Sequence, residues 1–295
     1  MISENSAFGK HICDTGEFNS IDRILLNSLH EDIGNGDVTT SALIPANHIS
    51  RAVIVAKGDF ILAGLPFAER SFRLLDDKIK STILKKEGGK IKSGDIIARI
   101  TGHTAGLLMA ERVALNILQR LSGIATLTDD YVQKVRGLRV KITDTRKTAP
   151  GLRLLDKYAV RTGGGHNHRY GLFDGVLIKD NHIAAAGGVG KAVKIARSHA
   201  HHLMKIEVEV KNIPEVKEAL SAGADVIMLD NMSIDVMKKA VNIIRGKNSG
   251  VIIEASGNVT LENVRSIAET GVDLVSVGAL THSAPAADIS LKIVF

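Results

Sequence analysis

The stretch from Arg139 to His182 contains the residues best suited to chemistry. It reads RVKITDTRKTAPGLRLLDKYAVRTGGGHNHRYGLFDGVLIKDNH and gathers arginines, lysines and histidines around tight glycines. Arginine binds carboxylate and phosphate through two parallel hydrogen bonds, and lysine supplies a point charge. We therefore interpret the stretch as part of an active site for an anion.

Polar or glycine residues also follow each expected strand in the second half of the chain. In chain order they are Asp144, Arg146 and Lys147, then Lys179 and Asp180, Glu209, Asp230 and Asn231, Glu254 and Ser256, and Gly278. A single such position is ordinary loop polarity. Six in succession favour a site, because barrel enzymes assemble their chemistry at the carboxyl ends of several strands.

The charges at and near these positions divide into two groups. The basic group comprises Arg146, Lys147, His168, Arg169 and Lys179. Glu209 and Asp230 suit a hard cation, and Mg²⁺ held by one or two carboxylates plus substrate phosphates is the usual arrangement for a phosphorylated metabolite. The pocket is therefore expected to hold a polyanion together with Mg²⁺.

The glycine-rich segments are not nucleotide-binding motifs of the common kinds. TGGGHNHR lacks the GxGxxG spacing, and no GxxxxGK[ST] loop occurs in the sequence. Consecutive glycines still let a backbone approach an anion closely. Ser256, Gly257 and Asn258, just before an expected helix, could hold phosphate in the same way.

The first part of the chain has the pattern of a small mixed α/β unit. Apolar residues from Ile21 to Leu29 recur at helical spacing, and the segment EDIGNGDVTT after them is expected to be a turn-rich exit. Strands are expected at 51–57 and 79–85, a helix at 66–75, and an extended segment at 91–100. From 103 to 136 the pattern predicts helices that are broken near Gly123.

After Arg139 the pattern becomes an alternation of short apolar strands and helices. AGADVIMLD and TGVDLVSVG resemble each other, as repeated βα units do. We expect an α/β protein: a small, sandwich-like N-terminal α/β domain with connecting helices over 1–125 and an open α/β barrel over 126–280. Residues 281–295 form a tail that is expected to return to the N-terminal domain.

Composition narrows the class of partner and the compartment. The 295 residues carry a formal net charge of +6, but aromatics make up 3%, Trp is absent, and basic residues are interleaved with acids. These features argue against nucleic acid and for a small polyanion. The single Cys13, the absence of a long apolar run and the absence of a secretory signal predict a cytoplasmic protein that does not bind membranes.

Several motifs together resemble those of quinolinate phosphoribosyltransferases, the decarboxylating enzymes also called nicotinate-nucleotide pyrophosphorylases. In order they are EDIGNGDVTT, ERVALN, DTRKTAPGLR, GGGHNHR, FDGVLIKDNHI, EVEV, IMLDN, EASGNV and VGALTHS. The resemblance covers the whole chain. It implies a homodimer, or a larger assembly, with active sites at the interface. It also implies that quinolinate and phosphoribosyl pyrophosphate give nicotinate mononucleotide, pyrophosphate and CO₂ in NAD biosynthesis.

The resemblance also implies roles for individual residues. Arg146, Lys147, His168 and Arg169 would bind the quinolinate carboxylates, with Lys179 completing the basic rim and Arg112 reaching in from the other subunit. Glu209 and Asp230 would orient the ribose hydroxyls and Mg²⁺. The phosphate-binding positions would be Ser256, Gly257, Asn258, Gly278 and His282. Lys147, Lys179, Glu209 and Asp230 would carry the catalysis.

Other interpretations of these residues remain open at this point. Without the resemblance, Arg112 is an ordinary solvated arginine on a helix. Glu207 shares a strand face with Glu209 and is expected to pair with a neighbouring base in a structural role. Lys179 or Lys147 could form a Schiff base in a barrel lyase. The scaffold could also act on another acidic ring, or bind an anion without catalysis.

Overall fold

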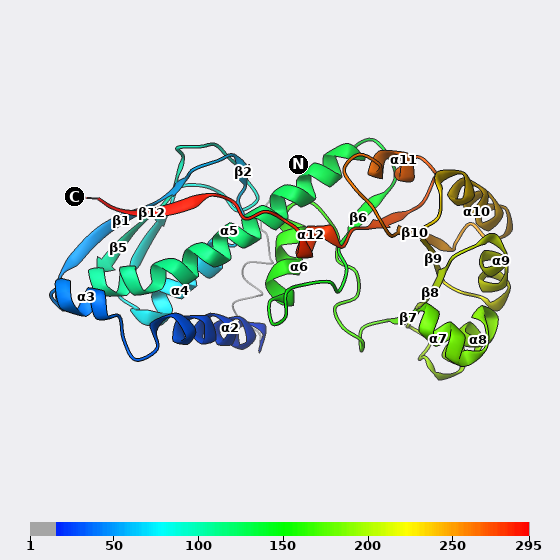
Figure 1. Ribbon diagram of the computed structural model, residues 1–295, viewed down its shortest axis with the longest axis horizontal. Helices are drawn as coiled ribbons and strands as arrows, with labels where there is room; N and C mark the ends of the chain where they lie inside the picture. The colour runs from blue at the N-terminus through cyan, green and yellow to red at the C-terminus, as the bar shows by residue number, and fades with distance from the viewer. Residues whose placement is uncertain (1–15, 295) are drawn as a thin grey trace. The chain divides into compact units, whose positions relative to one another are not determined.

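A computed structural model describes residues 16–294, with side chains from Ser20 onward (Figure 1). Cys13 lies outside the described residues. The chain divides into two compact units. The first contains the described residues up to Thr126, the segment Pro150–Gly163 and the stretch that begins at Ala284. The second contains Leu127–Ala149 and Gly164–Ser283.

The first unit is built on an antiparallel sheet with strand order β12-β1-β5-β3. Its strands are β1 (Ile49–Ala56), β3 (Lys80–Ile83), β5 (Ile96–His103) and β12 (Ile289–Val294), and β2 (Phe60–Ile61) pairs separately with β4 (Lys90–Ile91). β12 pairs with β1 along its whole length, from Arg51 opposite Val294 to Ala56 opposite Ile289. A strand that follows the barrel in the sequence therefore completes the sheet of the first unit.

The helices of the first unit enclose a continuous apolar core. They are α2 (Gly16–Ile33), α3 (Val38–Leu43), α4 (Leu65–Leu75), the first part of α5 (Thr104–Lys134) and α6 (Arg153–Thr162). Leu29, Phe72, Ile97 and Leu118 are among the fully buried side chains of this core. These side chains come from α2, α4, β5 and α5, so the core joins the sheet to its helices.

Two details of these helices differ from the expectation. The segment expected to be a turn-rich exit includes the start of α3, because the Asp37 carboxylate accepts hydrogen bonds from the N–H groups of Thr39 and Thr40 and caps a helix there. The helix break expected near Gly123 is wrong, since α5 runs without interruption. A glycine is required at position 123 because of packing: a Cβ there would lie 2.0 Å from the Pro285 carbonyl oxygen.

Two buried polar contacts stabilise the first unit. Arg120 on α5 and Asp156 on α6 form a bidentate pair with both distances at 2.8 Å, and Asp156 is fully buried. Glu87 accepts hydrogen bonds from the N–H groups of Gly64 and Leu65 at the start of α4 and from the Tyr158 hydroxyl. Burial raises the pKa of Glu87, and the hydrogen bonds reverse part of that effect.

The second unit contains a six-stranded parallel sheet with strand order β6-β11-β10-β9-β8-β7. Its strands are β6 (Lys141–Thr143), β7 (Val176–Ile178), β8 (Ile206–Val210), β9 (Val226–Asp230), β10 (Ile252–Ser256) and β11 (Leu274–Ser276). Among the described strands β6 and β7 pair on one side only, so the barrel is open. The expected α/β fold, a small N-terminal domain and an open barrel, is confirmed.

Helices follow each strand of the barrel from β7 onward. They are α7 (Asp180–Ala186), α8 (Val189–His199), α9 (Ile213–Ala222), α10 (Ile234–Lys247), α11 (Val264–Ala268) and α12 (Ala279–His282). Figure 1 shows α7 to α10 on the outer side of the strands. None of the helices between residues 16 and 294 is both long and apolar enough to cross a bilayer.

Candidate active site

The register of the barrel strands gathers the predicted acidic residues on one face of the sheet. Glu209 is aligned with Met228, which is aligned with Glu254. Two residues further along these strands, Asp230 is aligned with Ser256, and Ser256 with Ser276. Side chains alternate along a strand, so aligned residues and those two positions away share a face. The carboxyl ends of β8 to β11 therefore present these side chains to one space.

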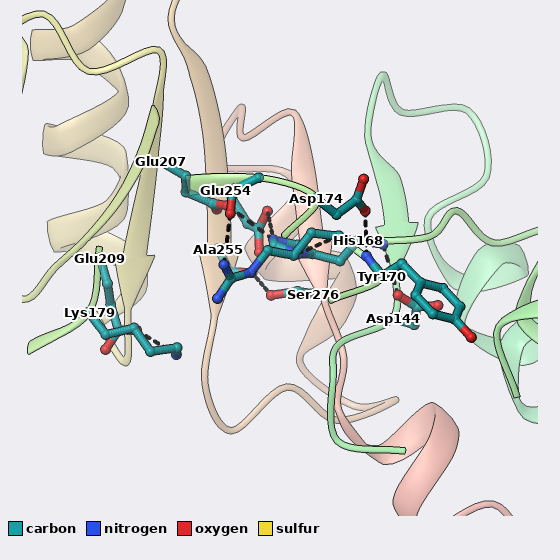
Figure 2. A network of polar contacts seen from close by, with 12 residues as sticks. Asp144, His168, Tyr170, Asp174, Lys179, Glu207, Glu209, Glu254, Ala255 and Ser276 are labelled. Atoms are coloured by element: carbon teal, nitrogen blue, oxygen red, sulfur yellow. Dashed lines mark hydrogen bonds and ion pairs between the residues drawn. The ribbon is translucent and has the colours of Figure 1, made fainter. Parts of the chain in front are cut away.

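His168 and two glutamates form a buried cluster beneath this space. The His168 Nε2 atom lies 3.1 Å from Glu207 Oε2 and 3.6 Å from Glu254 Oε2. Figure 2 shows both carboxylates turned toward the ring. Glu207 was expected to pair with a neighbouring base, and the base it contacts is His168. Glu254, noted in the sequence only as a strand end, was missed as part of this cluster.

The two nitrogens of His168 have opposing environments. Burial lowers the pKa of His168, but the hydrogen bonds and negative charges of Glu207 and Glu254 outweigh it and raise the pKa to about 10. The Arg169 N–H donates to Nδ1 over 2.9 Å. This contact favours the neutral ring with its proton on Nε2, so it acts against the increase in pKa that the two carboxylates cause. Burial also raises the pKa of Glu207. The ring therefore holds a proton at Nε2 in either form.

Asp144 fixes the loop that carries His168. This fully buried carboxylate accepts hydrogen bonds from Asn167 Nδ2 at 2.6 Å and from the His168 N–H at 2.8 Å. It follows β6 directly, and Thr143 in that strand bridges to His166. Its place at a strand end was visible in the sequence, whereas its supporting role depends on a segment more than twenty residues away.

Arg169 and Arg146 place two positive charges close together. Arg169 donates from Nη1 to the Gly175 carbonyl over 2.8 Å, and its buried Nε has no hydrogen-bond partner among the described residues. Burial lowers the pKa of Arg169, as does the charge of Arg146, while Glu207 and Asp174 act in the opposite direction. Two arginines that repel each other are well placed to bind an anion with two carboxylates.

Lys179 and Glu209 form a separate pair at the ends of β7 and β8. Their Nζ and Oε2 atoms are 3.1 Å apart, and the side chain of Lys179 is 48% exposed whereas that of Glu209 is 10% exposed. Figure 2 shows this pair apart from the His168 cluster. Lys211 and Asp180 form a similar pair at 3.2 Å, but both of its members are exposed. Lys179 is therefore accessible to a ligand while it remains oriented by a nearly buried acid.

The loops that follow β9 and β10 are polar, and each contains a residue with a strained backbone conformation. Asn231 and Asn258 both have left-handed backbone angles, with φ of 52° and 49°. Asn258 Nδ2 donates to Asn231 Oδ1, and Asn231 Nδ2 donates to Asp230 Oδ1, both over 2.9 Å. A Cβ on Gly257 would lie 2.3 Å from Asn231 Oδ1. Strained backbone of this kind is concentrated at functional sites.

The structure brings three further predicted residues together at the end of β11. A Cβ on Gly278 would lie 3.0 Å from Lys147 Cδ and 3.2 Å from His282 Nε2. The Thr281 hydroxyl donates to the Lys147 carbonyl over 2.9 Å. Lys147, Gly278 and His282 therefore share one corner of the barrel. Arg112 lies on α5 in the first unit with its side chain exposed.

Comparison with known proteins identifies the family. A model of the C-terminal domain of quinolinate phosphoribosyl transferase matches residues 124–292, and a model of its N-terminal domain matches residues 37–122. The chain belongs to the quinolinate phosphoribosyl transferase family. The resemblance stated from the sequence motifs is thereby confirmed.

Relatives support the assignment over nearly the whole chain. The chain is 45% identical to a probable carboxylating nicotinate-nucleotide pyrophosphorylase of Bacillus subtilis, over 92% of each chain. It is 47% identical to a protein of the same name in Synechocystis, over 93% of this chain and 92% of the relative. A solved nicotinate-nucleotide pyrophosphorylase from Francisella tularensis superposes with a TM-score of 0.88 at 42% identity, covering 94% of this chain and 96% of that one. The similarity therefore extends over both domains of the chain.

Proposed function

We propose that this chain is a decarboxylating quinolinate phosphoribosyltransferase of NAD biosynthesis. It would convert quinolinate and phosphoribosyl pyrophosphate to nicotinate mononucleotide, pyrophosphate and CO₂. The observation that supports this most directly is the placement of a basic group and an acidic group at the strand ends of one barrel. Relatives named as probable nicotinate-nucleotide pyrophosphorylases align with more than nine-tenths of the chain.

The basic group suits a ring with two adjacent carboxylates. Arg146 and Arg169 would bind the carboxylates in bidentate fashion, with His168, Lys147 and Lys179 completing the cationic surroundings. Desolvation by the protein strengthens each of these contacts, because charges interact more strongly away from water. The ring would thus be held with its nitrogen directed at the sugar.

The reaction needs positioning and charge stabilisation more than an enzyme nucleophile. The ring nitrogen donates its lone pair to the anomeric carbon of the ribose, and the bond from that carbon to pyrophosphate breaks with its electrons leaving on pyrophosphate. The product is a pyridinium. The adjacent carboxylate then departs as CO₂, its bonding electrons remain on the ring carbon, and that carbon takes a proton. Positioning and preorganised charge can supply most of such a rate enhancement.

Glu209 and Asp230 are suited to Mg²⁺ by their chemistry. They end neighbouring strands and lie on the same face of the sheet, and carboxylate oxygens are the ligands Mg²⁺ prefers. When bound, Mg²⁺ would offset the negative charge of the pyrophosphate. The same two side chains would accept hydrogen bonds from the ribose hydroxyls. Ser256, Gly257, Asn258, Gly278 and His282 would hold phosphate.

The test is a reaction of the purified protein with quinolinate, phosphoribosyl pyrophosphate and Mg²⁺, in which CO₂ and nicotinate mononucleotide are measured together. We expect both products in equal amounts from quinolinate and neither from nicotinate. Product from nicotinate or another acidic ring alone would assign the chain to a different substrate. Trapping of a lysine by borohydride would instead indicate a Schiff-base lyase.

We also propose a homodimer in which Arg112 of the partner subunit completes each site. Its exposed position on α5 is compatible with that role. Mixing inactive Arg112→Ala and Arg169→Ala proteins tests the idea, because a mixed dimer would regain one site with no substitution. Recovered activity supports sharing, and no recovery from dimers shown to exchange subunits argues against it. We expect the protein to act in the cytoplasm.

A further inference from the structure

The backbone of Lys147 is held on both sides, although the residue itself is exposed. Its N–H donates to Thr145 Oγ1 over 3.0 Å, and its carbonyl accepts from the Thr281 hydroxyl over 2.9 Å. Thr281 is 1% exposed and lies on α12, 134 residues later in the chain. A buried side chain from the last helix of the barrel unit therefore fixes the loop that carries Lys147.

The Thr281 hydroxyl has one proton and two carbonyl oxygens near it. The oxygen of Lys147 lies at 2.9 Å and that of Gly278, three residues earlier in the same turn, at 3.3 Å. Gly278 already accepts from the N–H groups of Thr281 and His282. A threonine on a helix often donates within its own turn. Here the shorter contact directs the proton to Lys147, so the hydroxyl links two segments of the barrel unit.

Gly278 leaves room for the side chain of Lys147. Its φ of −65° and ψ of −33° are helical angles that any residue adopts, so the backbone does not require glycine there. A Cβ would lie 3.0 Å from Lys147 Cδ and 3.2 Å from His282 Nε2. Contacts this short would displace the lysine chain. The absence of a side chain at Gly278 therefore keeps open the path that the lysine chain follows.

We propose that Thr281 is a positioning residue that acts through Lys147, and that Gly278 is small so that the lysine chain can pass. The inference rests on the proposed function, in which the ammonium group of Lys147 contacts an anionic substrate. Lysine carries its charge on a flexible four-carbon chain. Its charge is preorganised only if the backbone and the path of that chain are fixed. Thr281 needs no contact with substrate in this role.

The first test compares Thr281→Val with Thr281→Ser. Valine nearly keeps the shape of threonine and removes the hydroxyl, whereas serine keeps the hydroxyl. We expect Thr281→Val to lower kcat/KM for quinolinate about 10- to 100-fold, mostly through kcat, because misplaced catalytic groups lose rate on this scale. Thr281→Ser should stay within about 3-fold of wild type, since its hydrogen bond remains. Normal kinetics in the valine variant, or equal impairment of both, would overturn the proposal.

Thr270→Val is the matched control for the loss of a buried threonine hydroxyl. Thr270 belongs to the same unit, is 7% exposed and donates to the Ile267 carbonyl over 2.6 Å, within its own turn. Denaturant unfolding should therefore show a similar loss of stability in Thr270→Val and Thr281→Val. Thr270→Val should nevertheless keep kcat/KM within about 3-fold of wild type, because its site is independent. An equal loss of activity in the two would overturn the positioning role.

A double-mutant cycle tests whether Thr281 acts through Lys147. In Lys147→Met no ammonium group is left to position, so adding Thr281→Val should lower kcat/KM less than about 3-fold further. In Lys179→Met, where a different lysine is lost, Thr281→Val should keep its full effect of about 10- to 100-fold. Equal effects in the two backgrounds would show that Thr281 acts elsewhere and would overturn the proposal.

Gly278→Ala tests the path of the lysine chain. We expect kcat/KM to fall about 10-fold with little change in stability, because helical angles suit alanine. In Lys147→Met the same change should cost less than about 3-fold, which a direct contact between Gly278 and phosphate would not explain. Gly246→Ala is the control, since no heavy atom lies within 4 Å of its added Cβ. Normal kinetics in Gly278→Ala would overturn this part of the proposal.

Hydrogen–deuterium exchange measured by mass spectrometry tests the loop without any substrate. Peptides that cover residues 144–149 should exchange faster in Thr281→Val than in wild type, Thr281→Ser or Thr270→Val. Unchanged exchange in Thr281→Val would overturn the inference even if wild type is active. If wild type does not convert quinolinate but exchange rises in Thr281→Val, the proposed function fails and the link between Thr281 and the loop stands.

Discussion

Asp144 accepts a hydrogen bond from the backbone N–H of His168 over 2.8 Å, from a fully buried position. Its second oxygen accepts from Asn167. In Asp144→Asn one of these donors would face an NH₂ group. We expect the free energy of unfolding to fall by about 1–3 kcal/mol and kcat/KM for quinolinate to fall with it. Denaturant unfolding and steady-state kinetics measure both, with exposed Asp235→Asn as the control. Equal behaviour of the two variants would contradict the assigned role.

Lys179 and Lys211 form nearly equivalent ion pairs one strand apart, with Glu209 at 3.1 Å and Asp180 at 3.2 Å. Only Lys179 belongs to the proposed basic rim. We expect Lys179→Met to lower kcat/KM at least about 100-fold, because a charged contact to the dianion is lost, and Lys211→Met to lower it less than about 3-fold. Steady-state kinetics with quinolinate measures both. A comparable loss in both would point to the surface charge of this edge and not to a contact with substrate.

Gly257 occupies a backbone conformation that alanine does not tolerate. Its φ is +94°, and a Cβ would meet Asn231 Oδ1 at 2.3 Å. Gly257→Ala should raise the KM for phosphoribosyl pyrophosphate and lower stability by about 1–3 kcal/mol. Gly246 is the matched control, since it lies in α10 with no heavy atom within 4 Å of the added Cβ. Gly246→Ala should leave KM unchanged and add about 0.5–1 kcal/mol of stability. A normal KM in Gly257→Ala would remove this loop from the phosphate site.

The ion pair of Asp156 is buried and that of Glu269 is exposed, so the two pairs show how burial affects stability. Asp156 is fully buried against Arg120, whereas Glu269 is 50% exposed and pairs with Arg265 one helical turn away. Asp156→Asn should lower the free energy of unfolding by about 3–5 kcal/mol, because the arginine keeps a partly buried charge without its partner. Glu269→Gln should cost about 0.5 kcal/mol or less. Urea unfolding monitored by circular dichroism gives both values, and similar costs would show that burial does not govern the pair.

Glu87 makes the free energy of unfolding depend on pH, and the direction of this dependence follows from its raised pKa. Burial raises the pKa of this carboxyl in the folded protein above its ordinary value of 4.5. The folded state therefore takes up a proton at higher pH than the unfolded state, and the contribution of Glu87 to stability increases as pH falls from neutral toward 4.5. The difference in unfolding free energy between wild type and Glu87→Gln should accordingly change with pH over this interval. A constant difference would mean that Glu87 is ionised with its ordinary pKa.

Local patterns in the sequence were sufficient to predict the open barrel and which residues stand at the ends of its strands. Short apolar strands followed by polar residues gave the positions of Lys179, Glu209 and Asp230, because a parallel sheet brings its carboxyl ends to one edge. The helix break at Gly123 was wrong since the reason for that glycine is a chain segment more than 160 residues away. The role of Glu254 was missed because its burial and its contact with His168 arise only from packing.

The pairing of β12 with β1 has a consequence for how the protein is made. Until the ribosome has released Ile289–Val294, β1 remains an unpaired edge on that side, and such edges attract other chains. The barrel segments, by contrast, are all synthesised before this strand. A nascent chain that has not yet added Ile289–Val294 has all of its barrel strands but leaves β1 without this partner.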